Sequence, residues 1–533
     1  METPVRPGYR PCRRRRSRRL TGAAVVSRDL GDWQTPPELS ASVLNLLARR
    51  GIKWSRVLEP TCGTGSFLMA ALRAYPEPDE VIGIDVQARH LAEAREALGN
   101  PTTQVQLLQR DIFSTDLGRD LDWRTDGPML IVGNPPWVTN AELGSLGSNN
   151  LPRKSNVKGL TGLDAVTGSA NFDIAEYITL KLMNELSSER PTIALLVKTI
   201  VARNVLRHSK EMGWPIESAC IYRFNAHRAF GAAVDACLLV MECGGSDVIR
   251  EIPVYASLET DEPSHVMGFS NGDLVADIHS YRLARRMDGA SPLTWRQGVK
   301  HDAAPVMELE STPSGLLQNK LGEVVDVEAD FVFPLVKGTQ LNRGDTHDTP
   351  RWVIVPQRRL SDNTLWLQHK APKLWDYLTS HRDVFDGRRS SIYRGKPRFV
   401  IFGVGDYTFT DFKIAVSGLH KEPRFRLLGP IAGKPVVLDD TCYILPCHDR
   451  DQADLLLQIL NGPDVRHLLE ALMFPDSKRP ITKRLLQRID LGAALDCAGY
   501  LTARPDTVDR LKERIRVRDE TEASRGQLAL HMD

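Results

Sequence analysis

Residues 57–67 read VLEPTCGTGSF, an apolar run, two closely spaced glycines and the start of a second apolar run. We expect a buried strand, a tight loop and a helix, because glycine lets the backbone turn sharply and approach a ligand closely. A strand that enters a helix through such a loop is typical of open α/β sheets, which bind ligands at the carboxyl ends of their strands. The stretch therefore predicts an α/β fold with a ligand site at that edge.

Two further predicted strands each lead to a carboxylate. Val81–Ile84 ends at Asp85, about 20 residues beyond the glycine loop, where a carboxylate can bind ribose hydroxyls. Val105–Leu108 leads to Asp111, which can accept a hydrogen bond from an adenine amine. A single Asp at a strand end is more often a helix N-cap. The order of glycine loop, Asp and Asp at successive strand ends favours a nucleotide-like ligand.

A fourth predicted strand, Met129–Val132, ends in Gly133 and the turn Asn134-Pro135-Pro136-Trp137. The turn presents an amide, an unpaired main-chain carbonyl and an aromatic ring at the same edge. The Asn134 oxygen and the Pro135 carbonyl can each accept one N–H of an amine such as that of adenine, and the Trp137 ring can stack on the base. By itself, the turn is also compatible with an ordinary Asn-Pro loop start.

Beyond the turn, residues 139–169 form a polar, glycine-rich stretch long enough for a functional loop. Phe230 stands in a predicted loop between two apolar strands, 193–197 and 236–241. An exposed ring there could stack on the second face of a base. Packing of Phe230 in the core is the alternative.

The 533 residues, 42% hydrophobic and 26% charged, are enough for two or three domains. Eight cysteines without C-x-x-C spacing indicate a reducing compartment and argue against a disulfide framework or a zinc site. No apolar stretch approaches the roughly 20 residues that a membrane span requires. Four segments are expected: a basic, disordered tail (1–28), an α/β domain (29–290), a second domain (291–500) and a charged tail (501–533).

The second predicted domain combines short β-like runs with helices at 451–472 and 483–495. Basic and aromatic residues alternate in it from Lys337 to Lys413, a mixture that fits phosphate contacts interleaved with base contacts. A solvated basic face with buried aromatic residues is the alternative.

Together these motifs resemble the gamma class of AdoMet-dependent DNA N6-adenine methyltransferases, which includes the modification parts of type IIG restriction-modification enzymes. The resemblance extends over roughly residues 30–490. It implies an α/β fold, in which a Rossmann-like seven-stranded AdoMet-dependent methyltransferase domain is followed by a mixed α+β target-recognition domain.

The resemblance also implies roles for individual residues. The catalytic turn is Asn134, Pro135, Pro136 and Trp137, and Trp137 and Phe230 would stack on the substrate base. AdoMet would be bound by Thr35, Pro36, Glu59, Thr61, Gly63, Gly65, Asp85, Asp111, Ile112 and Asn134. Glu59 replaces the family's usual Asp and keeps its charge. No metal is expected.

The implied reaction is methyl transfer from AdoMet to N6 of a flipped adenine in double-stranded DNA, in a cytoplasmic bacterial restriction-modification or phage-defence system. A restriction endonuclease is expected to be a separately encoded partner, because only about 30 residues precede the methyltransferase domain and a nuclease domain requires on the order of 100. The alternative substrates for methyl transfer are an adenine in RNA and the side-chain amide of a protein glutamine. Glutamine methyltransferases share the turn but are short chains.

Overall fold

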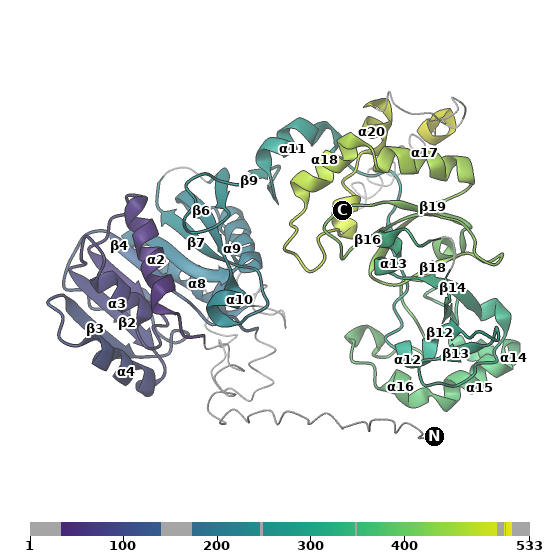
Figure 1. Ribbon diagram of the computed structural model, residues 1–533, viewed down its shortest axis with the longest axis horizontal. Coiled ribbons are helices and arrows are strands. Elements are labelled where there is room, and N and C mark those ends of the chain that lie inside the picture. The colour runs from purple at the N-terminus through teal and green to yellow at the C-terminus, as the bar shows by residue number, and fades with distance from the viewer. Residues whose placement is uncertain are drawn as a thin grey trace, which may run out of the picture. The chain divides into compact units, whose positions relative to one another are not determined.

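The computed structural model describes residues 33–139, 173–245, 249–346, 349–497, 506 and 508–513. Contacts divide the chain into two compact units, Met1–His265 and Val266–Asp533 (Figure 1). The predicted tail 1–28, nearly all of the predicted loop 139–169 and most of the tail 501–533 lie outside the described residues.

The first unit is built on a sheet with the strand order β8-β6-β7-β5-β4-β1-β2-β3 (Figure 1). Strand β7 is antiparallel to both of its neighbours, and the other pairings are parallel. The seven strands β1–β7 confirm the predicted methyltransferase-type sheet, and β8 extends it beyond β6. The bounds are β1 (Arg56–Glu59), β2 (Glu80–Asp85), β3 (Gln104–Gln109), β4 (Met129–Gly133), β5 (Thr192–Lys198), β6 (Ile216–Phe224), β7 (Ala236–Cys243) and β8 (Glu251–Tyr255).

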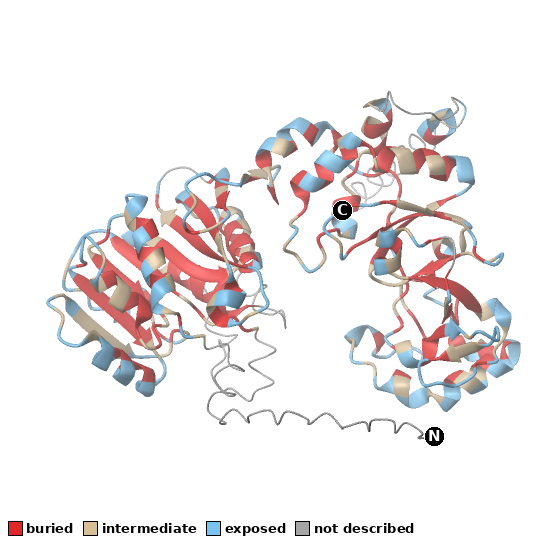
Figure 2. Cartoon of the chain, in the orientation of Figure 1, coloured by how far each residue is buried: buried red, intermediate tan, exposed pale blue. Residues whose placement is uncertain are grey.

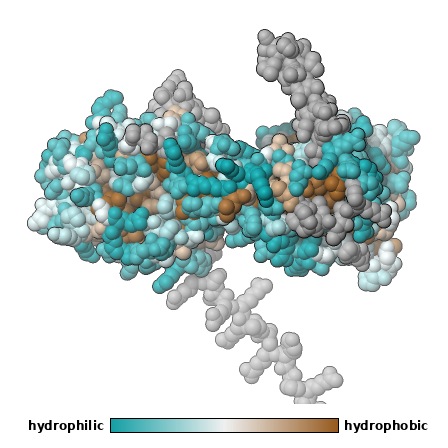
Figure 3. All heavy atoms as spheres, turned by 90° about the horizontal axis from the view of Figure 1, so that it is seen from above, coloured by the Kyte–Doolittle hydropathy of each residue, from teal (hydrophilic) through white to brown (hydrophobic). Residues whose placement is uncertain are grey.

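The central strands are buried along their whole length, as Figure 2 shows in red. Every residue of β1 and β4 is buried, which explains why these strands appear in the sequence as continuous apolar runs. The helices that accompany the sheet are α2 (Pro37–Arg49), α3 (Ser66–Leu72), α4 (Ala88–Leu98), α5 (Leu117–Asp120), α8 (Ile174–Glu185), α9 (Thr199–Glu211) and α10 (Ala226–Phe230). In the view of Figure 3, hydrophilic residues cover most of the described surface.

The second unit is a mixed α+β structure, as predicted, with a β-hairpin and two sheets. The hairpin is β9 (His265–Ser270) and β10 (Asp273–Val275). One sheet has the order β11 (Arg296–Gln297), β19 (Cys442–Cys447), β16 (Phe412–Ser417) and β17 (Arg426–Leu428). The other has the order β13 (Leu317–Asn319), β12 (Glu308–Ser311), β15 (Arg351–Ile354), β14 (Val332–Val336) and β18 (Val437–Leu438).

Helices pack around these sheets (Figure 1). Their bounds are α11 (Ile278–Ala284), α12 (Ala304–Met307), α13 (Gly338–Arg343), α14 (Leu367–Lys370), α15 (Pro372–Ser380), α16 (Arg382–Asp386), α17 (Arg450–Leu460), α18 (Pro463–Leu472), α19 (Lys483–Leu486) and α20 (Leu491–Cys497). Among the helices of the described ranges, none is long and apolar enough to cross a membrane.

The units divide between His265 and Val266, earlier than the composition change near residue 290 suggested. Ile278 and Met287 are buried in the same apolar cluster as Leu456 and Leu468, which belong to the C-terminal helices. Residues 266–290 therefore fold with the second unit, because their apolar side chains complete its core.

Both predicted C-terminal helices are interrupted. The predicted helix 451–472 is α17 and α18, because Gly462 and Pro463 end one helix and Pro463 starts the next. The predicted helix 483–495 is α19 and α20. Asp490 Oδ1 accepts a hydrogen bond from Ala493 N at 2.9 Å, which caps a new helix start.

Candidate active site

The carboxyl ends of β4, β1 and β2 border a cavity of about 370 Å³ in the first unit. Eight of the residues expected to contact AdoMet line it: Thr35, Glu59, Thr61, Gly63, Asp85, Asp111, Ile112 and Asn134. Pro36 and Gly65 stand just outside the lining, as the residues that precede α2 and α3. Residues placed on separate strand ends from the sequence thus surround one cavity.

The Asp85 carboxylate is held by main-chain groups at the end of β2. Gly63 N donates to Oδ2 at 2.9 Å, and Gln87 N donates to Oδ1 at 2.8 Å. The His90 ring also approaches, with Nδ1 3.5 Å from Oδ1. Gly63 has a φ of 51° and Gly65 a φ of 80°, the left-handed region that favours glycine. The glycine loop and the carboxylate therefore fix each other.

Glu59 is more deeply buried, with only 3% of its surface exposed. Its Oε2 accepts a hydrogen bond from Leu68 N at 3.2 Å, in the first turn of α3. Burial raises the pKa of Glu59 well above its usual value, although this hydrogen bond and one from Phe67 oppose the shift. The side chain thus ties the end of β1 to the start of α3 while it lines the cavity.

Residues 33–35, here called the strap, lie across the glycine loop. Gln34 Oε1 accepts hydrogen bonds from Thr64 N and Thr64 Oγ1, both at 3.1 Å, and Ser66 Oγ donates to Thr35 O at 2.7 Å. A Cβ atom at Gly63 would lie 2.6 Å from Gln34 Oε1. A side chain at position 63 would therefore displace the Gln34 amide, and the φ of 51° independently favours glycine.

The strap also orients Asn134. Asn134 Nδ2 donates to Trp33 O at 3.0 Å, whereas Asn134 Oδ1 is buried and has no hydrogen-bond partner among the described residues. A buried unpaired acceptor costs about 1–3 kcal/mol, so it calls for a functional explanation. Thr61 Oγ1, also part of the cavity lining, is likewise buried and has no partner within the described ranges. Both groups are available to a ligand in the cavity.

The other members of the turn differ in exposure. Pro135 is buried, whereas Pro136 lines the cavity. Trp137 is only 6% exposed, and its Nε1 donates to Leu196 O at 3.1 Å. The indole is therefore fixed against the end of β5.

Trp137 and Phe230 contact each other directly. Their ring centroids are 5.3 Å apart with an interplanar angle of 80°, and Phe230 is 8% exposed. Phe230 is the last residue of α10 rather than a loop residue. The Trp33 ring lies 6.4 Å from Phe230, and the Phe224 ring 6.2 Å from it. An edge-to-face pair leaves no parallel slot, so a base could lie between these two rings only if they moved apart.

The cavity wall also includes the apolar Ile112 and Phe113 beside the carboxylate of Asp111. Ile112 is 7% exposed, and the Phe113 ring packs 5.6 Å from that of Tyr177. Asp111 Oδ1 accepts a hydrogen bond from Phe113 N at 2.9 Å. A planar heterocycle with an exocyclic amine suits such a wall. In the described ranges, no three His, Cys, Asp or Glu side chains gather as a metal-binding group.

Sequence reasoning missed the rings around the turn. Phe224, at the end of β6, lies 6.4 Å from Trp137, and nothing local in its sequence indicates this contact. Trp33 acts through its carbonyl, which no side-chain pattern reveals. The position of Phe113 near the cavity could have been predicted, because it directly follows Asp111 and Ile112 at a predicted strand end.

Some of the basic and aromatic residues of the second unit are buried rather than exposed. Lys413 is 1% exposed, and its Nζ donates to Thr410 O. Tyr393 is 9% exposed, and the guanidinium of Arg388 lies 3.7 Å over its ring. These side chains serve the core, so the prediction of surface contacts is wrong for Lys413.

Comparisons with known proteins agree with this fold. Residues 57–123 match a family model described as a methyltransferase domain. The chain is similar to the type II methyltransferase M.NspV of Nostoc sp. (strain ATCC 29411 / PCC 7524), with 35% identity over 470 residues, 87% of this chain and 96% of that one. A shorter match, 29% identity over 111 residues, links it to the type II methyltransferase M.CvrRI of Paramecium bursaria Chlorella virus XZ-6E, covering 21% of this chain and 25% of that one.

Among solved structures, the fold resembles that of the type IIL restriction-modification enzyme MmeI in complex with DNA. The TM-score is 0.52, and the match covers 93% of this chain and 74% of that chain at 12% sequence identity. This likeness extends through both units and supports the fold alone. Because the identity with M.NspV spans nearly the whole of both sequences, the chain belongs to the family of type II methyltransferases, the methyltransferases of restriction-modification systems.

Proposed function

We propose that the protein transfers a methyl group from AdoMet to the N6 amine of an adenine flipped out of duplex DNA, as the modification component of a restriction-modification system. The observation that carries the proposal is the Asn134 amide. Its Nδ2 donates a hydrogen bond to Trp33 O, and its buried Oδ1 has no partner in the part of the chain that the structure describes. An acceptor in this state suits an incoming N–H donor.

The chemistry requires an acceptor rather than a strong base. The lone pair of the adenine amine is delocalised into the ring, so the amine must be drawn towards tetrahedral geometry before it attacks. Asn134 Oδ1 and the Pro135 carbonyl would each accept one N–H, which favours that geometry. A neutral Asn avoids burying a charge, which an Asp in the same place would add.

The cavity fits AdoMet as the methyl donor. Asp85 would bind the ribose hydroxyls, and the wall of Ile112 and Phe113 would hold the adenine ring with Asp111 at its amine. The glycine loop and Thr61 Oγ1, which has no partner among the described residues, would contact the methionine end. When bound, AdoMet supplies an electrophilic methyl group.

The ring cluster would receive the flipped base. Flipping costs a few kcal/mol, and stacking at about 1–3 kcal/mol for each base offsets it. Because Trp137 and Phe230 are in contact, the base would take its place only after these rings separate. Trp137 is held through Nε1, so Phe230, at the end of the short α10, is the ring we expect to move.

The second unit would select the DNA sequence. The structural neighbour MmeI was solved in complex with DNA, which supports duplex DNA as the partner. A restriction endonuclease with the same target would be the other member of the system.

Methylation-sensitive sequencing of DNA from cells that express the protein tests this function. We expect N6-methyladenine in one sequence motif, and none when the Asn134→Ala variant is expressed. Methylated RNA or a methylated glutamine amide, with unmodified DNA, would replace the proposal with one of those substrates. Cytosine methylation would contradict the adenine assignment.

Replacing Asp85 with Ala is expected to weaken AdoMet binding by about 1.5–3 kcal/mol, the contribution of a charged hydrogen-bonded group. The variant loses the ribose contact and also the acceptors that hold Gly63 N and Gln87 N. Isothermal titration calorimetry measures the affinity. Asp79→Ala is the matched control, since Asp79 is exposed and precedes the same strand. Equal affinities of a folded Asp85→Ala variant and the wild type would exclude Asp85 from the site.

A further inference from the structure

The second unit contains a hollow of about 710 Å³ that is lined mainly by cations. The charged residues in its lining are Arg388, Arg389, Arg394, Lys396, Arg398 and Asp386. Arg398 Nε binds Asp386 Oδ1 at 2.8 Å, which neutralises the acidic residue. A strong excess of positive charge therefore remains.

The floor of the hollow is rigid. Arg388 donates hydrogen bonds to Phe385 O at 3.0 Å, Val400 O at 2.8 Å and Arg398 O at 2.5 Å. Its guanidinium also lies 3.7 Å over the Tyr393 ring. These contacts use most of its donors. Arg388 is therefore a structural residue that shapes the hollow.

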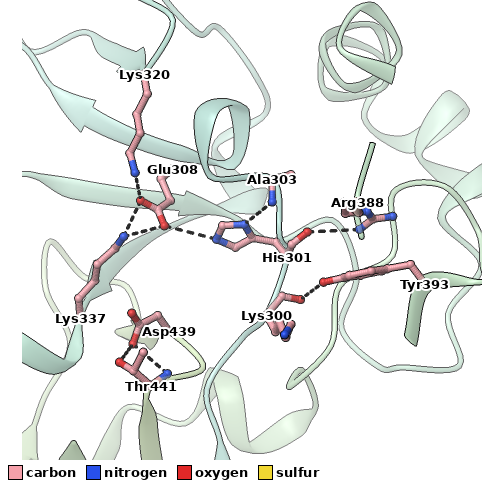
Figure 4. A network of polar contacts seen from close by, with 10 residues as sticks. All are labelled: Lys300, His301, Ala303, Glu308, Lys320, Lys337, Arg388, Tyr393, Asp439 and Thr441. Atoms are coloured by element: carbon pink, nitrogen blue, oxygen red, sulfur yellow. Dashed lines mark hydrogen bonds and ion pairs between the residues drawn. The ribbon is translucent and has the colours of Figure 1, made fainter. Parts of the chain in front are cut away.

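The floor is anchored to a buried ion cluster, as Figure 4 shows. Tyr393 OH donates to Lys300 O at 3.1 Å, and Arg388 reaches His301 O at 3.4 Å. The His301 ring lies 3.6 Å from Glu308 Oε1, and its Nδ1 accepts from Ala303 N at 3.2 Å. Burial lowers the pKa of His301, which agrees with a neutral ring that accepts at Nδ1.

Glu308 in turn binds two lysines, Lys320 at 2.5 Å and Lys337 at 2.6 Å (Figure 4). Glu308 is 6% exposed and His301 is 7% exposed, so the carboxylate and the imidazole are protected from water, whereas the Lys320 side chain is 44% exposed. Breaking a buried, paired charge of this kind costs several kcal/mol. The segment 300–303 and the hollow that rests on it are therefore held in one conformation.

Three cations at the rim of the hollow make no structural contacts of this kind. Arg389, Arg394 and Lys396 are exposed, and their side chains make no hydrogen bond or ion pair within the described part of the chain. A rigid floor with three unpaired cations around it is suited to an anionic ligand. One phosphate group would leave most of the hollow empty, so a polyanion fits the arrangement better.

We propose that this hollow binds the sugar-phosphate backbone of duplex DNA, with Arg389, Arg394 and Lys396 on neighbouring phosphates. The inference rests on the proposed function, which makes DNA the substrate. Contacts of this type position a duplex and carry no sequence information. They should therefore contribute affinity equally for target and unrelated DNA.

The test is a full-length variant with Arg389→Gln, Arg394→Gln and Lys396→Gln, which keeps Arg388 and the floor intact. Fluorescence anisotropy with duplexes of equal length, one with and one without the methylated motif, gives the DNA affinity over a range of salt concentrations. We expect at least about tenfold weaker binding to both duplexes and a salt slope lower by about 2 to 3, since each phosphate contact contributes roughly 0.9. AdoMet affinity and the methylated motif should not change.

The matched control removes the same charge from exposed positions of the same unit, with Arg285→Gln, Arg466→Gln and Lys478→Gln. Arg394→Gln alone should lower the salt slope by about 1. This single variant tests the proposal even if the triple variant fails to fold. If the triple variant equals the control in affinity and slope while wild type methylates DNA, the hollow is not a DNA site and the proposed function stands. If wild type itself binds no duplex DNA, both proposals fail.

Discussion

Asn134→Ala is expected to lower the rate of methyl transfer in a single turnover by about two to three orders of magnitude. Removing one well-placed acceptor from a site that excludes water costs roughly 3–4 kcal/mol in the transition state. AdoMet and DNA should bind nearly as before, because Asn134 contributes one of several contacts in the cavity. DNA binding can even tighten slightly if the ground state is strained.

The experiment uses saturating DNA and enzyme in excess, so that product release does not limit the rate. Asn100→Ala is the control, because Asn100 is exposed in the same unit. Asn134→Asp should retain more activity than the Ala variant, since it keeps an acceptor. It should still be impaired, because its second oxygen would face Trp33 O in place of the Nδ2 donor. A rate for Asn134→Ala within about threefold of wild type would make the turn a structural element.

The parts of the site that the sequence predicted are those encoded locally. Most of the expected ligand contacts lie at or just beyond the end of an apolar run, and parallel strands bring their carboxyl ends to one sheet edge. Asp85, Asp111 and Asn134 consequently line one cavity although they lie far apart in the chain.

The parts that sequence reasoning missed depend on tertiary packing. Trp33 O fixes Asn134 through the backbone, and the edge-to-face contact of Trp137 with Phe230 depends on where α10 ends. The unit boundary was placed too late because composition does not reveal which core residues 266–290 complete. Lys413 was wrongly placed on the surface, because a lysine in an amphipathic pattern is usually exposed.

The burial of Lys413 has a large expected effect on stability. Burial lowers the pKa of Lys413 from 10.5 to about 7, although Asp411 partly opposes the shift. Between pH 7 and about 10.5 the unfolded chain then binds a proton that the folded chain has released. The free energy of unfolding must therefore rise with pH across this window. Across the whole window, the rise in the free energy of unfolding is on the order of 4 to 5 kcal/mol, because each tenfold change in proton affinity contributes about 1.4 kcal/mol.

Lys413→Met should remove this pH dependence and stabilise the second unit near pH 7 by several kcal/mol, because an apolar chain of similar length replaces the buried amine. Loss of the hydrogen bond to Thr410 O offsets about 1 kcal/mol of that gain. The measurement is urea unfolding at pH 7 and at pH 9.5. The unfolded fraction is read from hydrogen exchange in peptides of β16 and β19, with every exchange pulse given at the same pH. Lys421→Met, at an exposed site, should keep the wild-type pH dependence. The other titrating groups are the same in all three proteins. If the free energy of unfolding changed with pH equally in wild type and Lys413→Met, the Lys413 amine would have to stay protonated and hydrated in the folded state.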